Sequence, residues 1–469
     1  MTLLKSSARI VAWVSLALLT ACATPGPDRL PRSALQAAQL GLHDPTSSPL
    51  TFEWWKAFGD PTLDALVAQA LQDQPSLAVA KARVDRMLAM ADVSQASALP
   101  QVSAGVDLAR QRYTENGLYP KPIAGNIYSS GTVQVGVAWS PDLFGQHTAE
   151  IAASLSQMQA ARADASAAAV SLAAQVSRAY VTLARLAAQH ELAQRAVAQR
   201  QHQFRLTSER VNAGLDTQLE QRQAESAWLE AQNQSEALRE QISLVRHQLA
   251  VLTGQGPGVY DSLLPRLEQL KLDPMPLTLG ADLLGRRADV VAARWRVEAA
   301  VHDVDVAHTQ FYPNVSLGAF AGVNAIGLDQ LFNNGSRQIG ITPAIRLPLF
   351  DGGRLRAQLK GRQGDLDVAI AGYNSVLLEA IKEASDAISS SHSLRRQQQD
   401  QAQVLAAAHA AYQVSVTRLN AGLVSQLTVL NAETQWLAQR RVAADLQARE
   451  LDNRVALMKA LGGGWRDER

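Results

Sequence analysis

The chain is a tandem duplication built on two very long helical stretches, and this feature limits its fold more than any other. One short segment occurs twice, first as Arg210-Val211-Asn212-Ala213-Gly214-Leu215 and then, about 208 residues later, as Arg418-Leu419-Asn420-Ala421-Gly422-Leu423. Each copy lies between long Ala- and Gln-rich stretches that contain no proline. Because glycine adopts the left-handed conformation at low cost and commonly ends a helix, we predict that both segments are tips of helical hairpins. A glycine inside one continuous helix is the alternative, and it would cost about 1 kcal/mol.

Before each long helical stretch, apolar residues alternate with a period of two. In the first predicted hairpin, at about 101–140, Val102, Val106 and Val135 lie on the apolar side, and the second hairpin, at about 314–347, repeats the pattern. Pro343 falls inside a predicted strand, where proline is normally confined to edges or bulges. Strands with one apolar face suit a membrane β-barrel, with lipid outside and water inside. A half-buried hairpin of a soluble protein gives the same pattern.

If these strands enter a membrane, one chain cannot form the barrel alone. Open strand edges are not tolerated in lipid, and the smallest barrels need about eight strands. Two copies would supply eight strands and a barrel filled by side chains, whereas three would supply twelve and leave a lumen. Several copies must therefore contribute to one barrel.

The N-terminus indicates export and lipid attachment. An apolar run, 10–19, is too short to span a bilayer as a helix. It ends in Leu19-Thr20-Ala21-Cys22, and Cys22 is the only cysteine of the chain. This resembles the lipobox of bacterial lipoproteins, which predicts a signal peptide at 1–21, an acylated Cys22 and an extended tether at 22–50. Ala23 follows the cysteine, a pattern that implies sorting to the outer membrane; an unmodified thiol in an ordinary signal sequence is the alternative.

The remaining segments complete two repeats, and their bounds follow from the matching motifs. Repeat 1 covers 51–254 with a helical hairpin at about 148–254, and repeat 2 covers 281–461 with a helical hairpin at about 354–461. A Pro- and Gly-rich linker, 255–280, joins them, and a tail, 462–469, ends the chain. We expect residues 50–75, the linker and the tail to pack midway along the helices, with Trp54 and Trp55 as packing anchors.

Catalytic and cofactor chemistry has no sequence signature. The net charge of +1 gives no reason to expect a nucleic-acid partner. There is no phosphate-binding glycine loop, nucleophile elbow or paired-cysteine site. His302 and His308 are six positions apart, a poor spacing for one metal on one helical face. We therefore predict no enzyme activity, no metal and no cofactor other than the lipid on Cys22.

In combination, five motifs resemble those of the outer membrane factors, the TolC- and OprM-like duct proteins, and most nearly their lipoprotein, NodT-like branch. The motifs are the lipobox at Cys22, Trp54-Trp55-x-x-Phe58-x-Asp60-Pro61, Phe311-Tyr312-Pro313, Leu349-Phe350-Asp351-Gly352-Gly353 and the paired Arg-x-x-x-Gly-Leu tips. The resemblance implies an α+β membrane protein of a Gram-negative bacterium. In it, a homotrimer forms a twelve-stranded β-barrel in the outer membrane, continuous with a twelve-helix α-barrel of coiled-coil hairpins in the periplasm.

The resemblance also implies partners and site residues. The tips, with Arg210, Gly214 and Leu215 in one and Arg418, Gly422 and Leu423 in the other, would meet a periplasmic adaptor that is linked to an inner-membrane transporter of small molecules. The family closes the periplasmic aperture with acidic rings, but the corresponding positions here are Thr428 and Asn431, with Glu220 at the equivalent place in repeat 1. Closure by hydrogen bonds and helix packing is therefore expected, and Asn431 could equally be a solvated helix residue. A duct for type I protein secretion and a non-pore coiled-coil lipoprotein scaffold are the alternatives.

Overall fold

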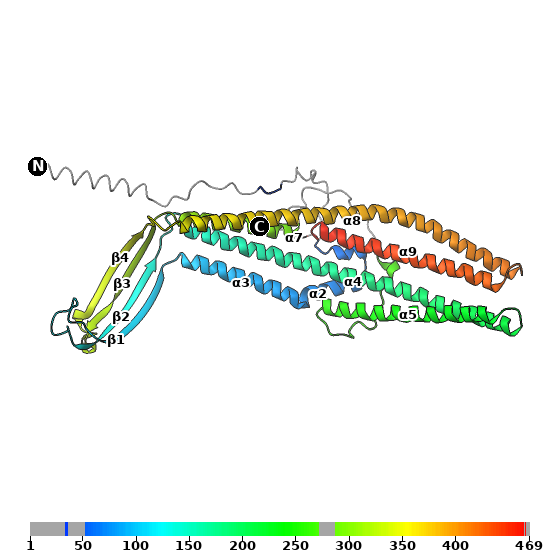
Figure 1. Cartoon of the computed structure of the whole chain (residues 1–469), viewed down its shortest axis with the longest axis horizontal. Helices are drawn as coiled ribbons and strands as arrows, with labels where there is room; N and C mark the ends of the chain where they lie inside the picture. Colours follow the sequence, from blue (N-terminus) through cyan, green and yellow to red (C-terminus); the bar gives the residue numbers. More distant parts are fainter. Residues whose placement is uncertain (1–32, 36–51, 272–286, 464, 466–469) are drawn as a thin grey trace. The chain divides into compact units, whose positions relative to one another are not determined.

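The computed structural model describes residues 33–35, 52–271, 287–463 and 465 (Figure 1). Cys22, the signal peptide, most of the tether, the linker from 272 onward and most of the tail lie outside the described residues. The chain forms two compact units. One consists mainly of Arg83–Ala161 and Ala293–Tyr373, and the other of Leu35–Ala82, Arg162–Ala292 and Asn374–Arg469.

The first unit contains one antiparallel sheet. Its strands are β1 (Gln101–Arg112), β2 (Ile127–Trp139), β3 (Asn314–Ile326) and β4 (Arg337–Arg346), and they lie in the order β1-β2-β3-β4. Each repeat therefore supplies one hairpin, and the two hairpins join where β2 pairs with β3. Tyr128 is the second residue of β2.

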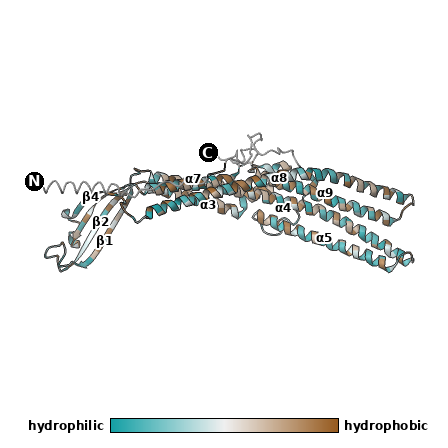
Figure 2. Cartoon of the chain, turned by 45° about the horizontal axis from the view of Figure 1, so that its top comes forward, coloured by the Kyte–Doolittle hydropathy of each residue, from teal (hydrophilic) through white to brown (hydrophobic). Residues whose placement is uncertain are grey.

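The strand register places most of the large apolar residues of the four strands on one face. Val137 of β2 faces both Val102 of β1 and Ala319 of β3, and Ala319 faces Ile341 of β4. Figure 2 shows the alternation of apolar and polar residues along the strands. In a single copy this apolar face is uncovered, since Val102 is 69 % and Ile341 72 % exposed. The opposite face carries mainly glycine and small polar residues.

Pro343, which the sequence places inside a strand, lies at the edge of the sheet within one copy. It lies in β4, opposite Leu317, and β4 is an edge strand of the four-stranded sheet. Proline cannot donate to a strand ladder, and within one copy only one side of β4 is paired.

Long helices follow the strands in both repeats. Helix α4 (Gln146–Asn212) and helix α8 (Arg354–Asn420) each have 67 residues. At 1.5 Å per residue this corresponds to about 100 Å. Each is preceded by a shorter helix before the hairpin of its repeat, α3 (Pro75–Ser97) and α7 (Ala288–Thr309). No helix within the described ranges is both long and apolar enough to cross a membrane.

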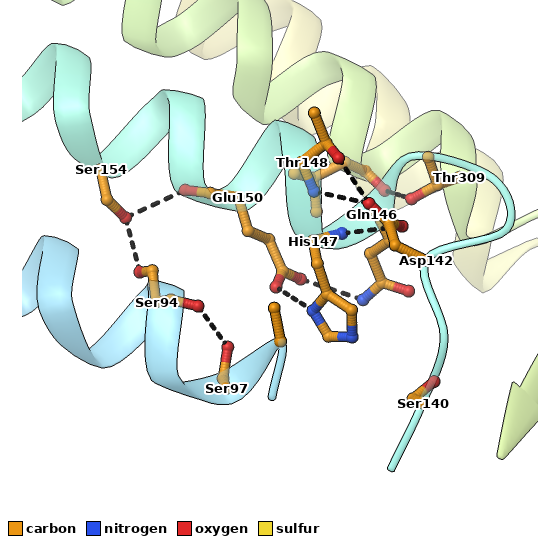
Figure 3. Close-up of polar contacts among 12 residues, drawn as sticks. Ser94, Ser97, Ser140, Asp142, Gln146, His147, Thr148, Glu150, Ser154 and Thr309 are labelled. Carbon is orange, nitrogen blue, oxygen red and sulfur yellow. Dashed lines mark hydrogen bonds and ion pairs between the residues drawn. The ribbon is translucent and has the colours of Figure 1, made fainter. Parts of the chain in front are cut away.

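An aspartate organises each passage from sheet to long helix. Asp142 accepts hydrogen bonds from the backbone amides of His147 and Thr148 at 3.2 and 2.8 Å, and from the Thr148 hydroxyl (Figure 3). Burial opposes ionisation of Asp142, but these hydrogen bonds outweigh it and lower its pKa. In repeat 2, Asp351 accepts from the amides of Gly353 and Leu355 at 2.9 and 2.8 Å. A carboxylate there satisfies free N–H groups at the positive end of the helix.

The second unit holds the ends of the long helices and their return arms, α5 (Gln218–Leu252) and α9 (Gln426–Ala460), each 35 residues long. Its core includes the tryptophan pair that the sequence predicts to be anchors: Trp54 is 2 % and Trp55 3 % exposed. Leu267 of the linker packs in the same core as Tyr180, near the middle of α4. The Tyr180 hydroxyl donates to Asp60 at 2.6 Å, and burial together with this bond raises the Tyr180 pKa.

A buried arginine ties the second repeat together within this unit. The Arg287 side chain is 6 % exposed and donates to Asp289 at 2.7 Å, to Glu383 of α8 at 2.8 Å and to the carbonyl of Ala460 at 3.3 Å. In repeat 1 a neutral side chain makes the equivalent hydrogen bond to the end of the return arm. There the Gln74 amide donates to the carbonyl of Val251 at the end of α5, at 3.1 Å.

Candidate functional site

Both hairpin tips end their long helices with the same backbone geometry. Gly214 has φ +70° and Gly422 has φ +72°, which confirms the predicted left-handed turns. In each tip the leucine amide donates to the carbonyl of the arginine five residues earlier at 2.9 Å, and the glycine amide donates to the carbonyl three residues earlier. These two bonds form a Schellman motif, which satisfies the free carbonyls of the last helical turn.

The leucine that follows each glycine is left uncovered. Leu215 is 65 % and Leu423 70 % exposed, so each tip presents one apolar side chain beside a glycine. No atom comes within 4 Å of a Cβ built on Gly214 or Gly422. The tips therefore offer open, small and locally apolar surfaces.

The arginines of the two tips differ in their partners. The Arg210 guanidinium donates two hydrogen bonds to the Asp216 carboxylate, at 2.7 and 3.0 Å. The hydrogen bond from Arg210 lowers the pKa of Asp216. Val424 occupies the position of Asp216 in the second tip, and Arg418 forms no ion pair in the part of the chain that the structure describes. The first tip thus has an internal ion pair, whereas Arg418 of the second tip has none among the described residues.

The return arms also begin differently. In α5, Thr217 and Glu220 form a capping box, in which the Glu220 carboxylate accepts from the Thr217 amide at 3.0 Å. Its hydrogen bond with Thr217 lowers the pKa of Glu220. In α9, Ser425 makes no side-chain cap, and Thr428 stands in the place of Glu220. Glu220 therefore has a structural task that Thr428 does not share.

Thr428 and Asn431 lie on one face of α9 and are exposed in a single copy. Gln435 continues this face, because positions three and four apart are neighbours on a helix. None of the three residues carries a charge. The face can form hydrogen bonds with neighbouring helices, but it cannot bind cations through carboxylates.

One buried glutamine links the two helical hairpins close to this face. Gln199 of α4 donates its side-chain amide to the carbonyl of Leu430 in α9 at 2.6 Å and to the Thr434 hydroxyl at 3.1 Å. Gln199 is only 6 % exposed. It borders a cavity of about 300 Å³ that residues of α4, α5 and α9 line. The link joins repeat 1 directly to the helix that carries Asn431.

Equivalent aromatic pairs hold the two arms of each hairpin together. Phe204 stacks on Trp228 with ring centres 5.7 Å apart, and Tyr412 stacks on Trp436 at 5.2 Å. Arg440 lies over the Trp436 ring at 5.5 Å. Both hairpins are therefore stiffened near their tips by large apolar contacts.

The described residues contain no group of three or more His, Cys, Asp and Glu side chains that could hold a metal ion. His302 instead lies 3.6 Å from Asp305 and 3.8 Å from Glu298 along one helix.

The structure places the predicted tip residues in two separate turns. Thr428 and Asn431 lie together near the start of α9, about one helical turn beyond the second tip. Sequence reasoning missed Asp216 and Gln199. An Asp six residues after the tip arginine in only one repeat was a readable signal for the first. Gln199 gives no signal, because its partner is 231 residues away.

Comparison with known proteins places these features in a family. Residues 66–255 and 279–463 match the family described as outer membrane efflux protein. The multidrug resistance outer membrane protein MdtP of Escherichia coli K12 is 31 % identical over 464 residues, covering 96 % of this chain and 95 % of that protein. The fusaric acid resistance protein FusA of Burkholderia cepacia is 38 % identical over 356 residues, covering 73 % of this chain and 66 % of that protein.

Solved structures share the fold. The outer membrane protein VceC of Vibrio cholerae superposes with a TM-score of 0.81 at 33 % identity, covering 88 % of this chain and 99 % of that one. The outer-membrane channel OprN gives a TM-score of 0.82 at 28 % identity, covering 94 % and 99 %.

Proposed function

The chain belongs to the outer membrane efflux protein family, and we propose that three copies of it form the outer-membrane channel of a tripartite efflux system. Twelve strands, four from each copy, would close a barrel with a lumen. The helical hairpins of the three copies would line a tube of twelve helices in the periplasm. The relatives named for multidrug and fusaric acid resistance support small molecules as the cargo.

The apolar face that runs across all four strands carries this proposal. It is uncovered in one copy, while the opposite face carries mainly glycine and polar residues. Lipid outside and water inside would satisfy both faces. The sheet also has two open edges, β1 and β4, which must be paired within a bilayer because unpaired backbone groups are costly there.

The hairpin tips would dock a periplasmic adaptor, which in turn contacts an inner-membrane transporter. Exposed Leu215 and Leu423 offer apolar contacts, and the glycines beside them allow a close backbone approach. Thr428 and Asn431 would form neutral rings at the periplasmic aperture of the trimer. Hydrogen bonds and helix packing would then close it, and Glu220 would serve mainly as the cap of α5.

Cys22 would carry the lipid that attaches each copy to the outer membrane. One acyl chain adds about 0.8 kcal/mol per buried methylene. A closed barrel buries far more apolar surface, so the lipid would assist targeting and not hold the assembled trimer in place.

A matched pair of lysine substitutions tests the membrane orientation. Ile341→Lys places a charge on the apolar face of β4, whereas Thr342→Lys places it on the opposite face. A lysine facing lipid costs about 2–4 kcal/mol per copy, so Ile341→Lys should strongly reduce the trimers recovered from outer membranes. Thr342→Lys should leave them near the unsubstituted amount.

Channel activity is measured on the same proteins in planar lipid bilayers. The unsubstituted protein should conduct ions and cross-link as trimers. A soluble coiled-coil scaffold would tolerate both lysines equally and would not conduct, and that result would refute the proposal.

A further inference from the structure

The two repeats meet inside the chain at a junction that can be described residue by residue. Strand β2 of repeat 1 pairs with β3 of repeat 2, with Ala138 opposite Gly318. Beside this pair, Phe144 of repeat 1 stacks on Tyr312 of repeat 2, with ring centres 5.2 Å apart and planes 6° from parallel. Ser140 donates to the carbonyl of Val315 at 2.9 Å. The β2 edge of repeat 1 thus packs against the β3 edge of repeat 2.

The counterparts of these aromatic partners are exposed. Phe350 occupies the place of Phe144 in the Leu-Phe motif of repeat 2, and Leu99 occupies the place of Tyr312 in repeat 1. Phe350 is 91 % and Leu99 62 % exposed. They lie at the two outer edges of the chain, after β4 and before β1. Each is the counterpart of one partner in the Phe144–Tyr312 contact, and in a single copy it lacks the other partner.

The helices of this unit show the same asymmetry. Leu366 of α8 packs on residues of α7. Met158 of α4 is the counterpart of Leu366, and α3 is the counterpart of α7, so Met158 lies on the side of α4 that faces α3. The opposite side of α4 is covered as well: Ala149, Ala153 and Ala160 are 8, 8 and 2 % exposed.

On α8 this opposite side is bare. Its matching residues are Ala357, Gly361 and Val368; Val368 is 72 % exposed, and no atom lies within 4 Å of a Cβ built on Gly361. At the other edge of the chain, Val93 of α3 is 70 % exposed, whereas its counterpart Val306 in α7 is half-buried. Among the described residues of one copy, helix α8 therefore has no neighbour on this side, and α3 has none on the side of Val93.

The register of the missing junction follows from the two hairpins. Gln101 faces Ala138 in the first hairpin, and Asn314 faces Arg346 in the second, so Ala138 corresponds to Arg346. The residue of β1 that corresponds to Gly318 is Gly105. Repeating the internal junction between copies thus sets Arg346 opposite Gly105 of the next copy. By the same shift, Ala344 faces Asp107 of the next copy.

The charges of the two open edges agree with this register. Asp107 is the only acidic residue in the four strands, and it lies on the polar face of β1. One oxygen of its carboxylate lies 3.9 Å from the position that a Cβ on Gly105 would occupy. Arg346 lies on the polar face of β4, and neither side chain has an ion pair within the described part of one copy. An arginine opposite Gly105 has room to reach the adjacent carboxylate, because diagonal neighbours on one sheet face are within reach of long side chains.

We propose that the α8–β4 edge of one copy packs against the α3–β1 edge of the next, repeating between copies the junction that joins the two repeats within the chain, with Arg346 beside Asp107 of the next copy. The occupant of the open edges is thus a second copy of this chain. This inference rests on the proposed assembly of several copies into one barrel and adds the residues and the register of its seam.

Disulfide trapping in outer membranes tests the register. The full chain with Asp107→Cys and Ala344→Cys places the two thiols directly opposite on the water-facing side. Oxidation should convert this double-cysteine protein to covalent dimers and trimers, which a reducing agent should separate into single chains. A matched control, Gly136→Cys with Phe320→Cys, copies this geometry inside the chain and should give only an internal bond. Each single-cysteine variant should give no covalent multimer.

A displaced pair decides whether the register is right. Ser103→Cys with Ala344→Cys moves one thiol four residues along β1, about 13 Å, beyond the reach of a disulfide. It should stay uncross-linked. Trimers that conduct but cross-link only through the displaced pair, or through neither pair, would overturn the inferred seam and leave the channel proposal standing. Absence of both trimers and conductance would refute the two together.

Charge reversal tests the ion pair separately. Asp107→Arg and Arg346→Asp should each lower the temperature at which trimers dissociate in detergent, and the double reversal should restore it. Arg337→Asp, at the far end of β4, is the control and should not be rescued by Asp107→Arg. If the double reversal is as unstable as the two single effects combined, Arg346 does not face Asp107.

Discussion

Replacing Gln199 by leucine should loosen the contact between the two helical hairpins and favour an open aperture. The substitution removes the hydrogen bonds of 2.6 and 3.1 Å to the Leu430 carbonyl and the Thr434 hydroxyl. Leucine is apolar and similar in size, so the buried space beside α9 stays filled.

The magnitude follows from counting bonds. The Leu430 carbonyl keeps a hydrogen bond from the Thr434 hydroxyl at 2.9 Å, so neither acceptor is left without a partner. Each lost bond then contributes about 1 kcal/mol net. Two bonds correspond to about 2 kcal/mol, or about a 30-fold shift between attached and detached hairpins in each copy. Thr434→Val removes only one of them and should shift the equilibrium about fivefold.

Conductance in planar bilayers at fixed protein amount measures the effect. Gln199→Leu channels should open more often and conduct more than unsubstituted channels, and Thr434→Val channels should fall between them. The matched control is Gln401→Leu. Gln401 donates to the Gln439 carbonyl at 3.1 Å, but both residues belong to the second hairpin. Identical conductance for the Gln199→Leu and Gln401→Leu proteins would refute the role of the link between hairpins.

Three further outcomes are expected. Gly422→Val should abolish capture of the adaptor while trimers persist, because a β-branched residue tolerates φ +72° poorly; Gly256→Val, at a glycine with open space around it and no left-handed φ, is the control. Cys22→Ser should remove labelled palmitate yet leave a reduced amount of functional trimer, and label retained on the substituted protein would contradict the lipobox. The lowered pKa of Asp216 means that its contact with Arg210 stabilises the first tip above the ordinary aspartate range and is lost as the pH falls through the lowered value. The protection of the first-tip amides against hydrogen exchange, relative to their intrinsic rate at each pH, should therefore fall in acid, and less so in Asp216→Asn.

The features that the sequence predicts well are local or periodic. The tips at Gly214 and Gly422 could be located because a glycine between two proline-free helical stretches determines the turn by itself. The apolar strand faces followed from alternation of period two. The role of Trp54 as an anchor followed from its size and its position before a helix.

The features that the sequence did not predict depend on distances between elements. Gln199 is one of many glutamines in α4, and only the approach of α9 singles it out. Glu220 matched an aperture position by alignment, yet the capping box with Thr217 engages its carboxylate. The strand register, which brings Asp107 and Arg346 to opposite edges, required the pairing partners of all four strands.

The equal lengths of the paired helices restrict how such a chain can change by insertion and deletion. Helices α4 and α8 have 67 residues each, and α5 and α9 have 35 each, although the loops between the strands differ in length. One added residue would advance a tip by 1.5 Å and turn every later side chain by about 100°. The turn would move a packed face out of its contacts, and the neighbouring helix could not compensate unless it gained a residue too. Length changes should therefore accumulate in the strand loops, while the helices of both halves can change length only together or by whole heptads.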